Sequence, residues 1–237
     1  MLTQPAYLVY GVARPGQASA LQGLRGLDGQ GLSVIRCGAL AAVVSSHQTD
    51  MFEEADTPAL HAFAASYHRC VTQMSAHMDL LPMQLGMMLA DAQAVRQYLQ
   101  ASSGPLETHL SQLAGFQEWQ LQLTLCDDSD AAPKVADAKM YLRARKAALD
   151  QKKAAQQSCD VYLEALAQHL LKDGARACRR APEGPNTLYV LWPRGADQAL
   201  LTLVEAQAAQ MDALRLDVHG PEAPFWFVRE ESQSDAA

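Results

Sequence analysis

Residues 118–125, Glu-Trp-Gln-Leu-Gln-Leu-Thr-Leu, alternate without interruption between polar and apolar side chains. Successive side chains of a strand point to opposite faces of a sheet, so this pattern predicts a strand with one buried and one exposed face. Trp119, Leu121 and Leu123 are expected on the buried face, together with Leu125. Glu118 is expected on the exposed face, with the two glutamines and the threonine.

A long helical region and two further strands follow this strand. Between residues 138 and 180, one helical stripe holds the apolar positions Tyr141, Ala148, Ala155, Tyr162, Leu166 and Leu170. Residues 188–192 form a continuous apolar run typical of a central strand. A helix over 197–213 and an alternating strand over 214–218 complete the pattern. The order β, long α, β, α, β predicts an α+β domain over 116–237, a ferredoxin-like variant with a helical insertion near 134–180.

The first half of the chain predicts a second α+β domain over residues 1–115. Strands are expected at 7–12, 32–36 and 39–45, with a hairpin or bulge at Cys37-Gly38. A helix begins near Thr57-Pro58, because a threonine cap followed by proline is a common helix start. Shorter helices are expected at 92–100 and 105–114, and the domain boundary is placed near Gly115.

Composition narrows the classes of protein and of partner. The chain has 237 residues, is 49% hydrophobic and carries a net charge of −7. No apolar run approaches the roughly 20 residues of a membrane-spanning helix. The five cysteines are odd in number and scattered, which favours a reducing, cytoplasmic compartment. Residues 134–180 carry 11 Lys and Arg against 5 Asp and Glu, but the overall acidity argues against nucleic acid as a partner. No membrane partner is expected.

The motifs of common catalytic and metal sites are absent from the sequence. It contains no glycine-rich phosphate loop, no nucleophile elbow and no paired-histidine zinc motif. His61 and His68 are seven residues apart on one predicted helix, too far for a shared metal ion. The acidic run 127–130 lacks the glycine and the closing glutamate of a calcium loop. We therefore expect no catalytic residue, no metal ligand and no cofactor.

Two apolar segments stand out instead. Met83, Met87 and Met88 cluster around Pro82 and Gly86, and methionine is common both in cores and at adaptable binding surfaces. Near the C-terminus, prolines precede the aromatic run Phe225-Trp226-Phe227. Three consecutive aromatic side chains cannot all lie on one face of a strand, so some need a second packing surface. Core packing and partner binding both remain open for these segments.

Together with their surroundings, these segments resemble the gas vesicle protein GvpF/GvpL family over nearly the whole chain. The motifs that carry the resemblance, in order, are Tyr7-Leu8-Val9-Tyr10-Gly11-Val12, His68, Leu81-Pro82-Met83-Gln84-Leu85-Gly86, Glu118-Trp119, Tyr141-Leu142-x-x-Arg145, Asn186-x-x-Tyr189-Val190 and Gly220-Pro221-x-x-Pro224-Phe225-x-Phe227. The chain departs from the family in two places. Gln84-Leu85-Gly86 stands where the family usually has Arg-Phe-Gly, and Glu222-Ala223 replace a Trp-Pro pair.

The resemblance implies a non-enzymatic minor structural or assembly protein of gas vesicles. Its implied partners are the small hydrophobic shell subunit and other gas vesicle accessory proteins. Its implied location is the cytoplasm and the vesicle wall, with the gas-facing side as one candidate. We hypothesise that six side chains contact the shell subunit: Met83, Met87, Met88, Phe225, Trp226 and Phe227. The family positions His68, Pro82, Gly86, Gly220, Pro221 and Pro224 are expected to be mainly architectural.

Two functions of other classes are the alternatives. A ferredoxin-like scaffold can also carry a small-molecule enzyme or a ligand-binding sensor, because one fold hosts many functions. A deep pocket with converging polar groups would favour that alternative. A nucleic-acid binder that uses the basic region 134–180 would show strongly salt-dependent binding.

Overall fold

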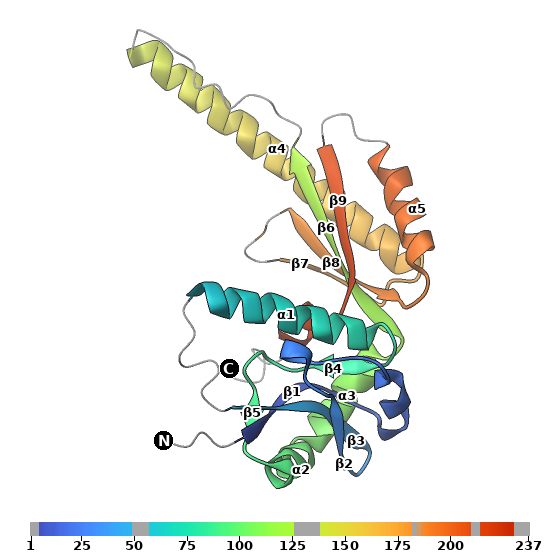
Figure 1. Ribbon diagram of the computed structural model, residues 1–237. Helices are drawn as coiled ribbons and strands as arrows, with labels where there is room; N and C mark the ends of the chain where they lie inside the picture. Colours follow the sequence, from blue (N-terminus) through green and yellow to red (C-terminus); the bar gives the residue numbers. More distant parts are fainter. Residues whose placement is uncertain are drawn as a thin grey trace. The chain divides into compact units, whose positions relative to one another are not determined.

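The computed structural model describes residues 5–48, 57–125, 138–181, 184, 186–209 and 214–229. In these ranges the chain combines helices with two antiparallel sheets, which confirms the predicted α+β class (Figure 1). Its contacts divide it into two compact units, residues 1–118 with 221–237, and residues 119–220. The predicted domain over 116–237 differs from this division, because the chain from Pro221 onward groups with the first unit.

The first unit is built on a five-stranded sheet with the order β2-β3-β1-β4, in which β5 also pairs with β1. The strands are β1 (Pro5–Ala13), β2 (Ser33–Cys37), β3 (Leu40–Gln48), β4 (Leu80–Pro82) and β5 (Met88–Leu89). The hairpin predicted around Cys37-Gly38 is present: Cys37 pairs with Leu40, the turn is Gly38-Ala39, and Gly38 has a positive φ of 59°. The short strands β4 and β5 were not predicted, because Pro82 and Gly86 obscure any strand periodicity.

Helices cover both faces of this sheet. α1 (Thr57–Ser75) lies on one face, and α2 (Ala92–Ala101) and α3 (Ser103–Leu113) lie on the other (Figure 1). α1 buries Tyr67, Val71 and Met74, which are spaced by four and three residues and so share one helical face. Two short 3₁₀ helices, η1 (Pro15–Leu21) and η2 (Leu27–Gly29), follow β1.

A pair of tyrosines joins α1 to the central strand. The rings of Tyr10 and Tyr67 are stacked with centroids 5.5 Å apart. The Tyr10 hydroxyl accepts a hydrogen bond from the Leu27 amide at 2.7 Å and shares another with the Ser45 hydroxyl. The Tyr67 hydroxyl donates a hydrogen bond to the Met83 carbonyl at 2.7 Å. Both buried tyrosine hydroxyl groups therefore have hydrogen-bond partners.

The second unit contains a four-stranded sheet with the order β7-β8-β6-β9. Its elements are β6 (Phe116–Leu125), α4 (Ala138–Lys172), β7 (Ala177–Arg180), β8 (Thr187–Pro193), α5 (Asp197–Ala208) and β9 (Leu214–Glu222). This β-α-β-β-α-β succession is the element order of the split β-α-β arrangement. β6 and β9 each contain a point at which the chain passes from one unit to the other.

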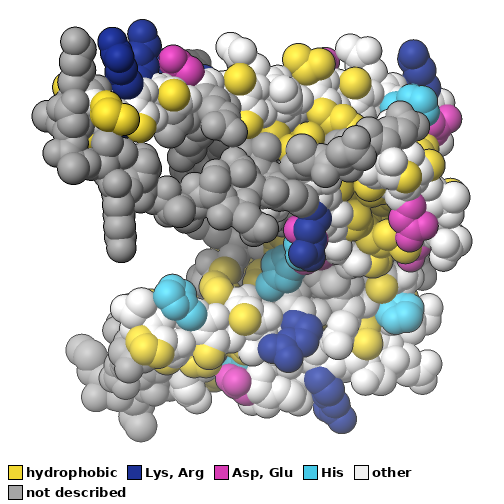
Figure 2. All heavy atoms as spheres, turned by 90° about the horizontal axis from the view of Figure 1, so that it is seen from above, with side chains coloured by type: hydrophobic (Ala, Val, Ile, Leu, Met, Phe, Trp, Pro, Cys, Tyr) yellow, Lys and Arg dark blue, Asp and Glu magenta, His cyan; other side chains and the backbone are white. Residues whose placement is uncertain are grey.

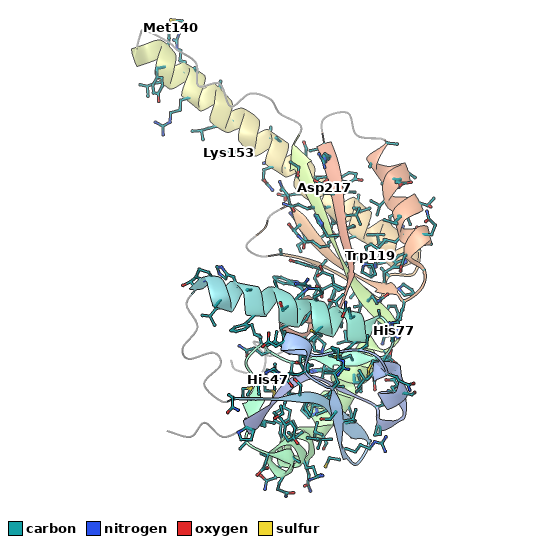
Figure 3. All side chains as sticks on the ribbon, in the orientation of Figure 1. His47, His77, Trp119, Met140, Lys153 and Asp217 are labelled. Atoms are coloured by element: carbon teal, nitrogen blue, oxygen red, sulfur yellow. The ribbon has the colours of Figure 1, made fainter. Side chains whose placement is uncertain are left out.

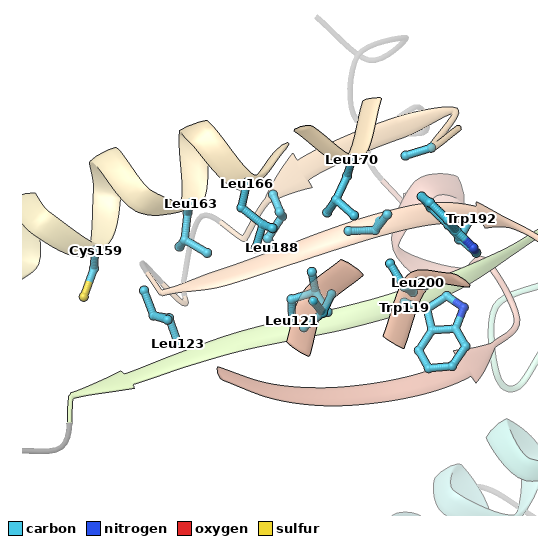
Figure 4. Packing of buried hydrophobic residues seen from close by; sticks show 13 residues of the cluster. Trp119, Leu121, Leu123, Cys159, Leu163, Leu166, Leu170, Leu188, Trp192 and Leu200 are labelled. Atoms are coloured by element: carbon cyan, nitrogen blue, oxygen red, sulfur yellow. The ribbon is translucent and has the colours of Figure 1, made fainter. Parts of the chain in front are cut away.

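The core of the second unit lies between its sheet and one half of α4. Cys159, Leu163, Leu166 and Leu170 are all at most 1% exposed. Their side chains point toward β6 and β8, where Leu121, Leu123, Leu188 and Trp192 meet them (Figure 4). The other half of α4 extends past the sheet (Figure 1), and none of the side chains described between 140 and 158 is buried.

Burial differs from the sequence pattern at two places. Trp119, Leu121 and Leu123 are buried as predicted, but Glu118, expected on the exposed face of the strand, is only 4% exposed. The apolar stripe predicted along α4 is covered over only part of its length, because Leu166 and Leu170 are buried whereas Tyr141 is 45% exposed. In both cases the residue pattern defines a face, and the neighbouring chain segments decide whether that face is covered.

Candidate binding surfaces

The C-terminal segment packs against α1 within the first unit. It consists of the end of β9, residues Ala223 and Pro224, and the single helical turn α6 (Phe225–Arg229). The ring of Phe225 stacks on the His68 imidazole with centroids 4.6 Å apart. The His68 Nε2 atom lies 3.3 Å from a Glu222 carboxylate oxygen. Through these contacts His68, an expected architectural position, connects α1 to the C-terminal segment.

The side chain of Glu118, at the start of β6, binds the backbone of the same segment. Its carboxylate accepts a hydrogen bond from the Trp226 amide at 2.8 Å and another from the Phe227 amide. Burial raises the pKa of the Glu118 carboxyl to about 8, although these two backbone donors act in the opposite direction. The nearby Glu222 carboxylate adds to the upward shift. A largely protonated acid therefore anchors the backbone of α6 near neutral pH.

The methionine segment forms a turn between β4 and β5. Gly86 has a φ of 86°, a left-handed conformation that glycine adopts without strain, and the Met87 amide donates to the Gln84 carbonyl at 3.2 Å. The Met87 carbonyl accepts from the Val9 amide at 3.0 Å. This turn leaves an open hollow of about 340 Å³ lined by Gln84, Leu85, Gly86 and Met87.

α6 contacts β4, the buried strand that leads directly into Met83. Met87, Met88, Phe225 and Trp226 are partly exposed. Met83 and Phe227 are buried, with 9% and 4% of their surfaces exposed, so they can support a contact surface from below but offer little area themselves.

The other expected architectural positions occupy backbone turns and strand ends. Pro82 lies opposite Gly11 in the pairing of β1 with β4. A Cβ atom added at Gly11 would lie 2.7 Å from the Leu80 side chain, so the two strands approach closely there. Gly220 has a φ of 134°, which favours glycine, and Pro224 is buried. Pro221 is partly exposed. These placements favour the architectural role that was expected for them.

The described residues contain no group of three or more His, Cys, Asp or Glu side chains that could hold a metal ion. Cys37, Cys70, Cys159 and Cys178 are free thiols, and Cys126 and the acidic run 127–130 lie outside the described residues. Burial raises the pKa of the Cys178 thiol to about 12, and it also raises those of Cys70 and Cys159. A raised pKa disfavours the thiolate, which is the nucleophilic form. No helix in the described ranges is both long and apolar enough to cross a membrane.

A second surface, on α4, was missed from the sequence. Of the seven large hydrophobic side chains that are exposed in the described ranges, six belong to α4: Met140, Tyr141, Leu142, Leu149, Val161 and Leu171. Met140 and Lys153 lie on the half of the helix that extends past the sheet (Figure 3). On the face shown in Figure 2, hydrophobic side chains lie among charged and polar ones. The sequence signal that could have indicated this surface is that large apolar residues alternate with basic residues in the predicted insertion, with apolar positions outside the predicted stripe.

The whole described architecture has relatives of known structure and sequence. The family model described as gas vesicle synthesis protein GvpL/GvpF matches residues 6–229. A "Gas vesicle protein L" from Streptomyces sp. (strain CB03234) is 24% identical over 253 residues, covering 96% of this chain and 94% of the relative.

Two crystal structures share the fold. GvpF from Anabaena sp. PCC7120 superposes with a TM-score of 0.66 at 20% identity, covering 95% of this chain and 96% of that one. GvpF from Microcystis aeruginosa superposes with a TM-score of 0.67 at 15% identity, covering 94% and 98%. Because the family model spans nearly all of the described chain, this protein belongs to the gas vesicle GvpL/GvpF family, a family of structural and assembly proteins rather than of known enzymes.

Proposed function

We propose that this protein binds the small hydrophobic shell subunit of gas vesicles while the shell forms. Family membership supports the gas vesicle role. The observation that carries the contact surface is that both apolar segments are partly exposed in the first unit, where α6 contacts β4, the strand that leads directly into Met83. Met87, Met88, Phe225 and Trp226 provide the exposed part, and Met83 and Phe227 lie beneath it.

A protein that binds the shell subunit would prevent its aggregation before assembly. A shell subunit that will face gas must present apolar surface, and exposed apolar surface leads to aggregation before assembly. An acidic protein with a net charge of −7 can cover that surface and keep the complex dispersed by charge repulsion. Methionine side chains suit the task because they adapt to differently shaped apolar partners.

We place the protein in the cytoplasm and at the vesicle wall, including the gas-facing side, and propose that it contacts other gas vesicle proteins there. The alternative of a small-molecule enzyme or ligand sensor has no supporting observation in the described part of the chain. The open hollow at the methionine turn is lined by Gln84, Gly86 and the apolar Leu85 and Met87, none of which has a titratable side chain.

Co-purification with the shell subunit tests the proposal. Tagged wild-type protein is expressed with that subunit and compared with Met87→Asp, Trp226→Asp and Trp226→Ala. The alanine variant adds no carboxylate beside Glu118, whose side chain accepts from the Trp226 amide. Leu60→Asp is the matched control, because Leu60 is 38% exposed in the same unit but lies on α1, outside the two contact segments.

All variants are first checked for native circular dichroism and melting temperature. We expect wild type and Leu60→Asp to capture the subunit, and folded Met87→Asp and Trp226→Asp to lose most of the capture. The absence of capture by folded wild type, with the other vesicle proteins also supplied, would exclude direct shell binding. Equal capture by all folded variants would move the contact away from these segments.

A further inference from the structure

The outer face of α4 has no covering element within the described chain. Val161 is 72% exposed and Met140 is 58% exposed, although both are large apolar side chains. The core residues Cys159, Leu163 and Leu166 lie on the other side of the same helix. An exposed apolar face on a helix whose opposite face is already buried is a common feature of helices that pair with another helix.

The residues on this face follow a heptad pattern. Steps of four and three residues connect the partly or fully exposed positions Met140, Ala144, Ala147, Ala154, Ser158, Val161 and Ala165. The step from Ala147 to Ala154 spans one full heptad. Alternating steps of three and four keep one seam of a helix against a partner helix. At 1.5 Å per residue, the seam is about 38 Å long.

The seam is complementary in size to itself when two copies run antiparallel. If Ala147 of one copy faces Ser158 of the other, then Met140 faces Ala165 and Ala144 faces Val161. Each large side chain therefore meets a small one, which allows two helices to interdigitate closely. A parallel pairing would instead place Met140 against Met140 and Val161 against Val161.

Charge favours the same orientation. Residues 138–158 contain six Lys and Arg against one Asp, whereas 159–173 contain three acidic residues against one Lys; of these acids Asp160 is already paired with Arg180 at 2.6 Å, and Glu164 is the one that lies beside the seam. An antiparallel pair places the basic half of each helix beside the acidic half of the other. In the register above, Arg143 beside the seam lies across from Glu164 of the second copy, twice per pair. A parallel pair would place the two basic halves against each other.

We propose that α4 is a self-association surface, through which two copies of this chain pair by antiparallel contact of their α4 helices. The occupant of the exposed face is a second copy of the chain, because both the sizes and the charges along the seam complement themselves. This surface shares no residue with the proposed shell-binding surface, so a pair of copies would carry two shell-binding surfaces.

Sedimentation equilibrium of the full-length protein tests this pairing. We expect wild type to be dimeric, and Val161→Asp to be monomeric, since it places a carboxylate in the seam. Leu149→Asp is the matched control, because Leu149 is 53% exposed on α4 but lies away from the seam. We expect Leu149→Asp to remain dimeric. Circular dichroism and the melting temperature establish that all three proteins are folded.

Charge reversal tests the register. Arg143→Glu and Glu164→Arg should each weaken the dimer about tenfold or more, because each creates two like-charge contacts per pair. The double variant R143E/E164R should restore it, and so should an equimolar mixture of the two single variants. A wild-type protein that stays monomeric would overturn the proposal, including the case in which α4 is covered only by another gas vesicle protein. Dimers that Val161→Asp leaves intact would also overturn it.

Discussion

The C-terminal segment and the first half of α4 show opposite relations between sequence regularity and burial. The C-terminal segment is short and irregular, yet Ala223, Pro224 and Phe227 are buried and its backbone is bound by Glu118. Residues 138–158 form a long regular helix in which no described side chain is buried. Specific partner groups, rather than regular structure, decide which segment is anchored to its unit.

This difference also separates two kinds of candidate surface. The contact surface proposed for the shell subunit is built on anchored backbone, so its side chains are held in place before a partner arrives. The exposed face of α4 has a regular backbone and is not covered by any of the described residues, so a partner helix can reach it. Four experiments test this contrast, beginning with the strongest anchor.

Phe227→Ala should have the largest effect. Phe227 is only 4% exposed, and truncation of a buried phenylalanine leaves a cavity that costs about 3–5 kcal/mol of the free energy of unfolding. Urea denaturation followed by circular dichroism measures the loss. Val228→Ala, at the next and partly exposed position, should cost much less. A loss of less than about 1 kcal/mol for Phe227→Ala would show that the C-terminal segment is not firmly anchored.

Glu118→Gln should change the pH dependence of stability. The folded protein holds the Glu118 proton up to about pH 8, whereas the unfolded chain releases it near the ordinary pKa of 4.5. The wild-type free energy of unfolding should therefore fall, relative to that of Glu118→Gln, as pH rises between these values. The expected relative change is on the order of 3 kcal/mol.

Urea titrations at about pH 5, 6, 7 and 8 measure the free energy of unfolding of both proteins across this interval. Subtracting one protein from the other removes the contributions of groups that titrate in both, such as the histidines. A difference that does not vary with pH would contradict a buried, protonated Glu118 at the C-terminal segment.

His68→Ala should have a smaller effect, of about 1 kcal/mol. It removes the stacking on Phe225 and the contact with Glu222, but His68 and Glu222 are 43% and 38% exposed, so solvent weakens their interaction. His68→Phe keeps a ring for stacking and should recover part of the loss. Hydrogen exchange of the Phe225–Arg229 amides measures the anchoring directly, and unchanged exchange in His68→Ala would exclude His68 as an anchor.

Much of the architecture could be predicted from the sequence, because it rests on local periodicity. The alternation at Trp119, Leu121 and Leu123 predicted a half-buried strand, and the start of α1 was predicted from Thr57-Pro58. The family resemblance was carried by ordered motifs and is confirmed by the family match over 6–229.

The remaining features depend on contacts between segments far apart in the chain. The burial of Glu118 requires α6, which lies more than one hundred residues later, and no local pattern at 118–125 could indicate it. The return of the chain from Pro221 to the first unit is likewise a matter of tertiary packing. The contact residues Met87 and Trp226 remain predictions, since burial alone does not identify a partner.

Leu149→Ala should have the smallest effect, and its matched control lies on the same helix. Leu149 and Leu163 are two heptads apart and so share one side of α4, but Leu163 is fully buried whereas Leu149 is 53% exposed. Leu163→Ala should cost about 2–5 kcal/mol, because it opens a cavity against the sheet. Leu149→Ala should change the free energy of unfolding by less than about 0.5 kcal/mol, because Leu149 already exposes more than half of its surface to solvent. Leu149 lies away from the proposed α4 seam, so this expectation holds for the monomer and the dimer alike. A loss of stability above about 1–2 kcal/mol would be too large for an exposed side chain. It would show that this side of the first half of α4 is covered in solution.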